Sequence, residues 1–218
     1  GIGNYTTLLS SGTWWRAVGV TLGLVVVAVL LQLLLATAFA ASLRRITVAA
    51  PVVRVLVLVP LGLLGVAPHR GRGDAVTVGF VPQWFGLDGT GDLTRVVGAL
   101  LAEVWRGTGI TTIILLAGLR RVSRPLLESA VADGAGPWQR FSRVVLPAAA
   151  PAVAVAVVYR ALDALRAFES PRLLVDGTVP DPVHTVTTLT WDTTFSAFET
   201  GLGAAMSVLL VLLESSVV

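Results

Sequence analysis

The sequence predicts an all-α protein that crosses a lipid bilayer several times. Hydrophobic residues make up 55% of the chain and charged residues only 13%, and the mean hydropathy is +0.82. A water-soluble domain of this length needs more polar residues to cover its surface, so most of the chain must lie in lipid. Long uncharged runs alternate with short charged loops, and a helix needs about 20 apolar residues to span a bilayer. Together these observations predict a polytopic bundle of transmembrane helices.

Five runs are apolar enough to be candidate spans. They are residues 17–43, 55–68, 93–119, 144–159 and 201–213. The first is the clearest, because it has no charged residue and its only polar groups are Gln32 and a few hydroxyls. The second is short and contains Pro60 and Gly62, which predict a kink. We therefore expect about five spans in one transmembrane domain, residues 1–218.

The distribution of arginine predicts which loops face the cytoplasm. All 16 basic residues are Arg. Loops 44–54 and 120–143 contain three and five of them, whereas loop 170–199 contains one Arg and four acids. Positively charged loops stay on the cytoplasmic side, so the first two loops are predicted inside and the third outside. Arg70 and Arg72 lie in a loop predicted to be outside and do not follow this rule.

The N-terminal residues predict a surface helix. Residues 3–16 are polar and aromatic, which is typical of a short helix at the membrane interface, with Trp14 and Trp15 as its anchors. The arginine distribution places Gly1 outside, and no signal-peptide pattern is present. We therefore expect at least one missing span before this point.

Several classes of function are excluded by missing residues. There is no Cys, and therefore no disulfide or cysteine nucleophile. A phosphate-binding loop needs a Lys before its Ser or Thr, and without any Lys this chain is not expected to be an ATPase or to bind a cofactor. His69 and His184 have no ligand-like sequence neighbours, so no metal site is expected. A net charge of +3 with dispersed Arg argues against nucleic-acid binding.

Residues 125–147 form the most informative segment outside the predicted spans. Pro125 suits the first turn of a helix, and Gly134 can adopt the left-handed conformation that ends one. Pro137 then starts a second helix, which Pro147 is expected to close. The apolar residues expected on one face of this second helix are Trp138, Phe141 and Val145. Two short amphipathic helices outside the membrane present an apolar face that needs a partner.

This segment resembles the EAA loop of the permease subunits of ABC importers. The family pattern is Glu-Ala-Ala, three residues, Gly, nine residues, Ile, one residue and Leu-Pro. The matching residues here are Glu128, Ser129, Ala130, Gly134, Val144, Leu146 and Pro147. Ser129 and Val144 are mild departures from it. The triplet Asp133-Gly134-Ala135 and the upstream LLAGL at 115–119 are similar to the carbohydrate-importer branch, of the maltose and trehalose type.

The resemblance implies a fold, a mechanism and a set of partners. The fold is that of a type I ABC importer permease, in the bacterial cytoplasmic (inner) membrane, and residues 120–147 are its coupling segment, which sits in a groove of the ATPase. The residues expected to make this contact are Leu126, Leu127, Glu128, Ala130, Asp133, Gly134 and Ala135. The implied partners are a second homologous permease, two ATPase subunits that bind ATP and Mg²⁺, an extracytoplasmic sugar-binding protein and the lipid bilayer. The substrate implied is a disaccharide or oligosaccharide resembling trehalose or maltose.

Charged residues within or at the ends of the predicted spans, together with one aromatic residue, are candidates for the translocation path or a gate. Such charges are energetically costly and often functional. The candidates are Glu103, Arg106, Arg160, Asp163, Arg166 and Phe168. Glu103 and Arg106 lie three residues apart on one helical face, where mutual neutralisation is an alternative. Arg160, Asp163 and Arg166 either line the path, where Phe168 can stack on a sugar, or only extend to the membrane interface.

Three rival interpretations stay open from the sequence. The chain can be an ABC permease for another solute, such as phosphate or amino acids, although the triplet at 133–135 argues against it. It can be an intramembrane enzyme with Glu103 or Asp163 as a general base, which requires a second catalytic group at the same depth. A purely structural membrane subunit fits the composition but leaves the coupling-segment spacing to chance.

Overall fold

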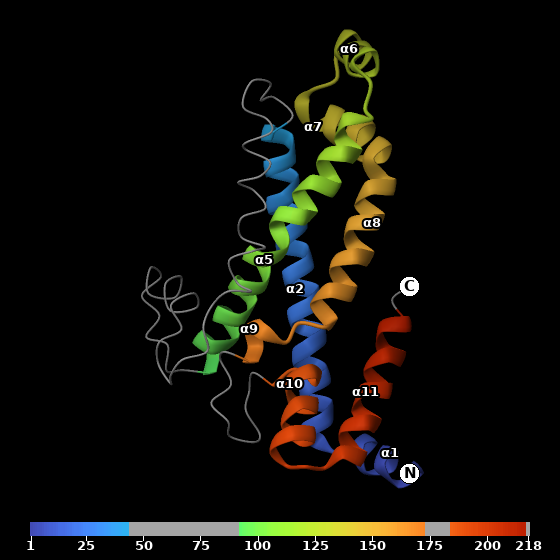
Figure 1. Ribbon diagram of the computed structural model, residues 1–218. Coiled ribbons are helices and arrows are strands. Elements are labelled where there is room, and N and C mark those ends of the chain that lie inside the picture. The colour runs from blue at the N-terminus through green and yellow to red at the C-terminus, as the bar shows by residue number, and fades with distance from the viewer. Residues whose placement is uncertain (44–91, 173–183, 217–218) are drawn as a thin grey trace. The chain divides into compact units, whose positions relative to one another are not determined.

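The structure is a computed structural model that describes residues 1–43, 92–172 and 184–216 (Figure 1). Every regular element in these ranges is helical. The N-terminal part contains α1 (Ile2–Leu9) and α2 (Gly12–Leu43), and the central part contains α5 (Asp92–Arg120), α6 (Arg124–Ala132), α7 (Pro137–Arg140) and α8 (Leu146–Leu165). The C-terminal part contains α9 (Glu169–Arg172), α10 (Val186–Trp191) and α11 (Thr200–Ser215). Single π-helical turns, Phe141–Val145 and Asp192–Ser196, precede α8 and follow α10.

Three described helical stretches are long and apolar enough to cross a membrane: Gly12–Leu43, Val96–Arg120 and Pro137–Leu165. They confirm the spans predicted at 17–43, 93–119 and 144–159. The run at 201–213 also forms a helix, α11, which is shorter than the other three. The span predicted at 55–68 lies outside the described residues.

Two details of the predicted elements are wrong. Residues 3–16 are not one surface helix, because α1 ends at Leu9 and α2 begins at Gly12. As a result Trp14 is buried in a hydrophobic core, and only Trp15 stays exposed, with its indole N–H donating to the Leu9 carbonyl at 2.8 Å. Tryptophan has a large apolar ring and one polar N–H, so it occurs both in protein cores and at membrane interfaces.

The second helix of the coupling segment does not end at Pro147. The helical path continues from Pro137 to Leu165, with Pro147 in the first turn of α8. The π-helical turn at Phe141–Val145 lies just before it. Proline interferes with the carbonyl one turn earlier and lacks an N–H. A π turn changes that hydrogen-bond pattern locally, and this explains how the helix passes through the proline.

The described residues group into two compact units. Among the described residues, unit 1 comprises 1–29, 92–104, 161–172 and 184–216, and unit 2 comprises 30–43 and 105–160. Unit 1 has a core formed by α1, the start of α2, α10 and α11. Its buried members are Leu8, Trp14, Ala17, Val186, Leu189, Ala205 and Met206.

Unit 2 has a core rich in alanine. Its buried members are Ala36, Ala40, Leu43, Leu115, Leu116, Leu119, Ala149 and Ala156, from α2, α5 and α8. Small residues allow membrane helices to approach closely, so that dispersion contacts between backbones hold them together. The coupling segment belongs to this unit and connects the end of α5 to the start of α8.

Candidate functional site

The turn between α6 and α7 is built by a Schellman motif. Gly134 has φ of +78°, as predicted for a left-handed helix stop. Its N–H donates to the Val131 carbonyl at 3.0 Å, and the N–H of Ala135 donates to the Ala130 carbonyl at 2.9 Å. These two bonds satisfy carbonyls that the end of α6 would otherwise leave without a partner. The turn therefore depends on a residue that tolerates positive φ.

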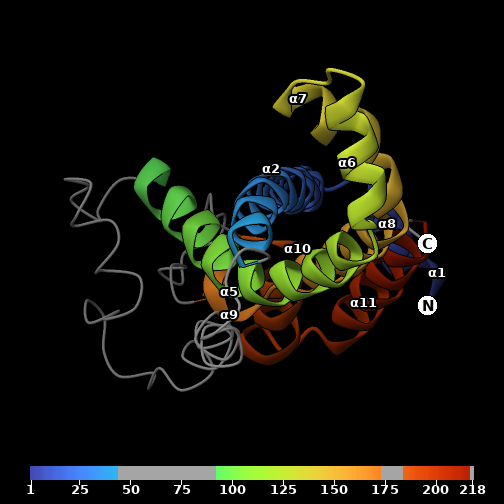
Figure 2. The ribbon, with the colours of Figure 1, turned by 90° about the horizontal axis from the view of Figure 1, so that it is seen from above.

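The start of α7 is fixed by a local hydrogen bond. The side-chain oxygen of Gln139 accepts from the backbone N–H of Gly136 at 2.9 Å, one half of a capping box. Gly136 itself has an ordinary φ of −67°. Trp138 and Phe141 lie 5.8 Å apart between ring centroids, so two of the three aromatic and apolar residues predicted to share a face do so. Figure 2 shows α6 and α7 joined by this turn.

The coupling segment exposes apolar and acidic side chains together. Trp138 is 74% exposed, and three further large apolar residues are also exposed: Leu126, Val131 and Leu146. Glu128 and Asp133 are exposed on the same short segment, whereas Leu127 and Ala130 are half-buried. Exposed large apolar side chains close together on one short segment are typical of a protein contact.

The charged residues predicted inside the spans lie in different surroundings. Glu103 is buried and borders a small cavity in unit 1, with room for about one water molecule. Arg160 is fully buried in unit 2, where its Nε donates to Gln32 Oε1 at 2.9 Å, so it does not extend to the interface. Arg106 and Asp163 are half-buried. The role of these residues in the path stays a prediction.

Arg166 forms an ion pair that the sequence did not indicate. Its Nη2 lies 2.6 Å from Glu214 Oε2, near the end of α11. The side chain of Arg166 is 67% exposed, whereas that of Glu214 is 10% exposed. The hydrogen bond to Glu214 and the charge of that carboxylate raise the pKa of Arg166, which stays cationic. The pair joins the end of α8 to α11 within unit 1.

Phe168 belongs to a row of three aromatic rings. Its ring centroid lies 5.4 Å from that of Trp191, which lies 4.4 Å from that of Phe195. Trp191 and Phe195 are one helical turn apart, and both are exposed. An exposed aromatic row offers faces on which an apolar surface or a sugar ring can stack.

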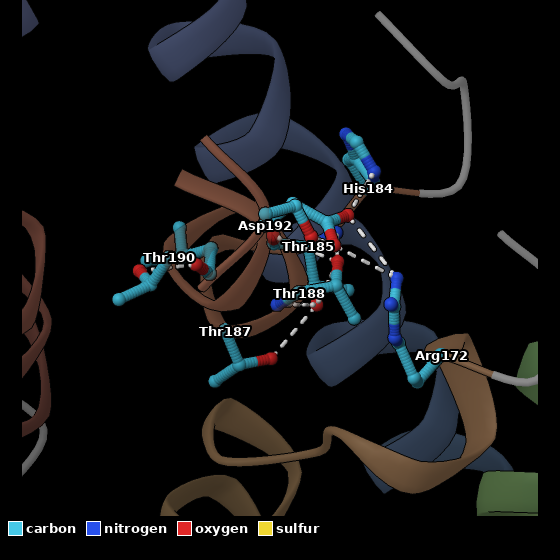
Figure 3. A network of polar contacts seen from close by, with 9 residues as sticks. Arg172, His184, Thr185, Thr187, Thr188, Thr190 and Asp192 are labelled. Carbon is cyan, nitrogen blue, oxygen red and sulfur yellow. Dashed lines mark hydrogen bonds and ion pairs between the residues drawn. The ribbon is translucent and has the colours of Figure 1, made fainter. Parts of the chain in front are cut away.

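A polar network surrounds the start of α10 (Figure 3). Arg172 Nη1 lies 3.0 Å from Asp192 Oδ1, and His184 Nε2 lies 3.2 Å from Asp192 Oδ2. His184 is thus beside an acid in space, which the spacing in sequence did not indicate. Thr185 caps α10 by accepting from the Thr188 N–H, and Thr187 donates to the Ala167 carbonyl at 2.7 Å. The network fixes α10 against the end of α8.

Sequence reasoning missed Gln32, Asp192 and Glu214 as partners of charged residues. A signal existed for Gln32, because it is the one amide in an otherwise apolar run. Glu214 likewise ends an apolar run, and polar residues at such places usually have partners. Which Arg each of them meets depends on tertiary contacts that spacing along the chain does not encode.

Comparisons with known proteins agree with this architecture. The model of the binding-protein-dependent transport system inner membrane component family matches residues 38–217. The trehalose transport system permease protein SugA of Mycobacterium tuberculosis is 36% identical over 216 residues, covering 96% of this chain and 69% of SugA. The trehalose/maltose transport system permease protein MalF of Thermococcus litoralis is 27% identical over 242 residues, covering 99% and 76%.

The fold also matches a solved structure. In the crystal structure of a bacterial ABC transporter involved in the import of the acidic polysaccharide alginate, one chain superposes with a TM-score of 0.77 at 23% identity, covering 100% of this chain and 80% of the other. This likeness supports the type I importer fold. With the family match over most of its length, the chain belongs to the binding-protein-dependent transport system inner membrane components, the permease subunits of ABC importers.

Proposed function

We propose that this chain is a permease subunit of an ATP-driven sugar importer and forms half of the path for a disaccharide such as trehalose or maltose. The observation that carries the proposal is the 36% identity to a trehalose permease over nearly the whole chain. Identity of this extent includes the helices as well as the coupling segment. The relatives named for trehalose and maltose point to the same substrate class.

The partners follow from the family. A second permease completes the path, two ATPase subunits bind ATP and Mg²⁺, and an extracytoplasmic sugar-binding protein delivers the substrate at the bacterial cytoplasmic membrane. A transporter related in structure has been crystallised with a pentasaccharide-bound periplasmic protein. This likeness supports a binding-protein partner for this chain.

Residues 120–147 couple the permease to the ATPase. The exposed apolar surface around Leu126 and Trp138 supplies the buried contact, and Glu128 and Asp133 pair with basic groups of the ATPase groove. Closure of the two ATPase subunits on ATP moves the segment, and α5 and α8, which it connects directly, transmit the movement into the membrane. The Schellman turn at Gly134 gives the segment one defined shape for this contact.

The sugar passes aromatic and charged side chains on its way. Phe168, with Trp191 and Phe195 beside it, offers rings for stacking, and Asp163 and Arg166 offer hydrogen-bonding groups. Glu103, Arg106 and Arg160 are the remaining candidates for the path or its gate. An ABC permease for a different solute is the alternative, and it predicts no preference for aromatic residues at these positions.

The experiment is reconstitution of the complete transporter in liposomes, with its partner permease, ATPase and binding protein. ATP-dependent uptake of labelled trehalose and maltose is compared with uptake of phosphate and amino acids. Sugar uptake that requires this chain supports the proposal. Uptake of only a non-sugar solute would favour the alternative permease.

A further inference from the structure

A buried polar contact joins two helices of unit 2. The guanidinium of Arg160 on α8 donates through Nε to the side-chain oxygen of Gln32 on α2 at 2.9 Å, and both residues are 0% exposed. Arg160 therefore does not reach solvent or lipid headgroups. Charged side chains at such positions in membrane helices are rare and usually have a function.

The third long helix, α5, approaches this contact at Gly107, a residue without a side chain. A Cβ placed on Gly107 would collide with the guanidinium of Arg160 and with the amide nitrogen of Gln32. The carbonyl of Gly107 accepts from Thr111 Oγ1 at 2.8 Å within α5. A Cβ at this position would push the ends of the Arg160 and Gln32 side chains aside, so the glycine keeps room for the contact between α8 and α2, and three helices meet around one cation.

The alanines next to this contact distinguish poorly between helix positions that differ by one turn. One turn from Arg160 lies Ala156, and one turn from Gln32 lies Ala36, with Ala40 a further turn away. A helix that slides by one turn, about 5.4 Å, places one alanine where another was. The contacts of these alanines are therefore nearly equivalent in the two positions and do not by themselves set the register. The hydrogen bond between Arg160 and Gln32 is not equivalent in the two positions, because sliding separates the two buried groups that form it.

We propose that Arg160, Gln32 and Gly107 are positioning residues that fix the axial register of α2, α5 and α8, so that a displacement of the coupling segment moves the three helices together. This inference rests on the proposed coupling function of residues 120–147. It assigns Arg160 to the transmission of movement through unit 2 and not to contact with sugar. Loss of the contact allows the helices to slip, and part of the movement is then lost.

The first test measures register directly and does not depend on transport. The chain has no Cys, so within this chain nitroxide labels attach only after Leu34→Cys on α2 and Val155→Cys on α8, both at exposed positions of unit 2. Pulsed electron–electron double resonance then gives the distance between the two labels in the complete transporter. We expect one narrow distribution with Arg160 present and a distribution broadened by up to about 5.4 Å with Arg160→Met. An unchanged distribution would overturn the register claim.

The second test measures coupling in the same proteoliposomes. Gly107→Ala, Gln32→Leu and Arg160→Met should each lower the sugar imported per ATP hydrolysed by about twofold to thirtyfold, the range of coupling effects of residues outside the ligand sites. Gly23→Ala is the matched control, because a Cβ at this α2 glycine meets no neighbouring atom. In an Arg160→Ala background, Gly107→Ala should add little further loss. Equal import ratios in all these variants would overturn the link between register and coupling.

The two readouts separate this inference from the proposed function. Variants that fail to insert are recognised by their absence from the membrane fraction, and Gly107→Ala, which keeps the charge, then replaces Arg160→Met in the label experiment. One outcome is that Arg160→Met changes the register but a variant of the coupling segment leaves transport intact. This outcome refutes the proposed function of residues 120–147 and leaves the register claim standing. Unchanged register with a functional coupling segment refutes only the inference.

Discussion

Gly134 is the residue on which the shape of the coupling segment depends most. Its φ of +78° lies in the left-handed region, and nothing surrounds the position at which a Cβ would be added. Gly134→Ala therefore introduces no collision, and its cost is the backbone conformation alone. For a residue with a Cβ this cost is about 1–2 kcal/mol.

This cost shifts the balance between the observed turn and other conformations by about fivefold to thirtyfold, since 1.4 kcal/mol is a factor of ten. We expect sugar-stimulated ATP hydrolysis and sugar uptake to fall, by up to that factor. Gly134→Asp should have at least as large an effect, because it adds a charge to the contact surface. Both activities are measured in proteoliposomes at matched amounts of inserted protein.

Gly136→Ala is the control, two residues away in the same loop. Gly136 has φ of −67°, and an added Cβ meets only the Gln139 side chain, at 3.9 Å. This substitution should leave both activities close to wild type. Equal activity of Gly134→Ala and Gly136→Ala, or a larger loss for the latter, would refute the argument that the left-handed turn matters.

The remaining predictions concern unit 1. Thr21 Oγ1 accepts from the N–H of Val186 at 2.9 Å. Thr21→Val should therefore lower the free energy of unfolding by about 1–3 kcal/mol, whereas Thr21→Ser should leave it unchanged. Thermal unfolding in detergent compares the two variants. Arg166→Gln should lower the melting temperature more than Glu214→Gln does. Arg166→Gln leaves the largely buried Glu214 carboxylate unpaired, whereas Glu214→Gln leaves an exposed cation unpaired. A larger effect of Glu214→Gln would contradict this reasoning. Trp191→Ala should raise the sugar concentration needed for half-maximal uptake, with Trp191→Phe closer to wild type; no change would remove the aromatic row from the path.

Most of the helical architecture was accessible from the sequence, because hydropathy and charge determine which segments enter lipid. The span at 17–43 and the glycine stop at Gly134 were both predicted correctly. Helix stops of this kind are local, so a single residue type in the right context reveals them.

Contacts between residues far apart in the chain could not be predicted from the sequence. Pro147 was expected to end a helix, yet the π-helical turn before it lets the helix continue. Trp14 was assigned to the interface, although it lies in a core. Arg160 and Gln32 are 128 positions apart in sequence, and no periodicity links residues at that separation. Their contact is set by how three helices cross, which a single sequence does not state.

The central claim is that this chain carries a sugar across the membrane and couples it to ATP through residues 120–147. The most direct test is to measure labelled trehalose uptake and ATP hydrolysis together in liposomes with the complete transporter, with wild type beside Gly134→Asp. We predict ATP-dependent uptake by the wild type and a joint fall of uptake and sugar-stimulated hydrolysis in the variant, at equal membrane insertion. Equal uptake and hydrolysis by the two proteins would contradict the coupling role, and absence of sugar uptake by the wild type would contradict the substrate.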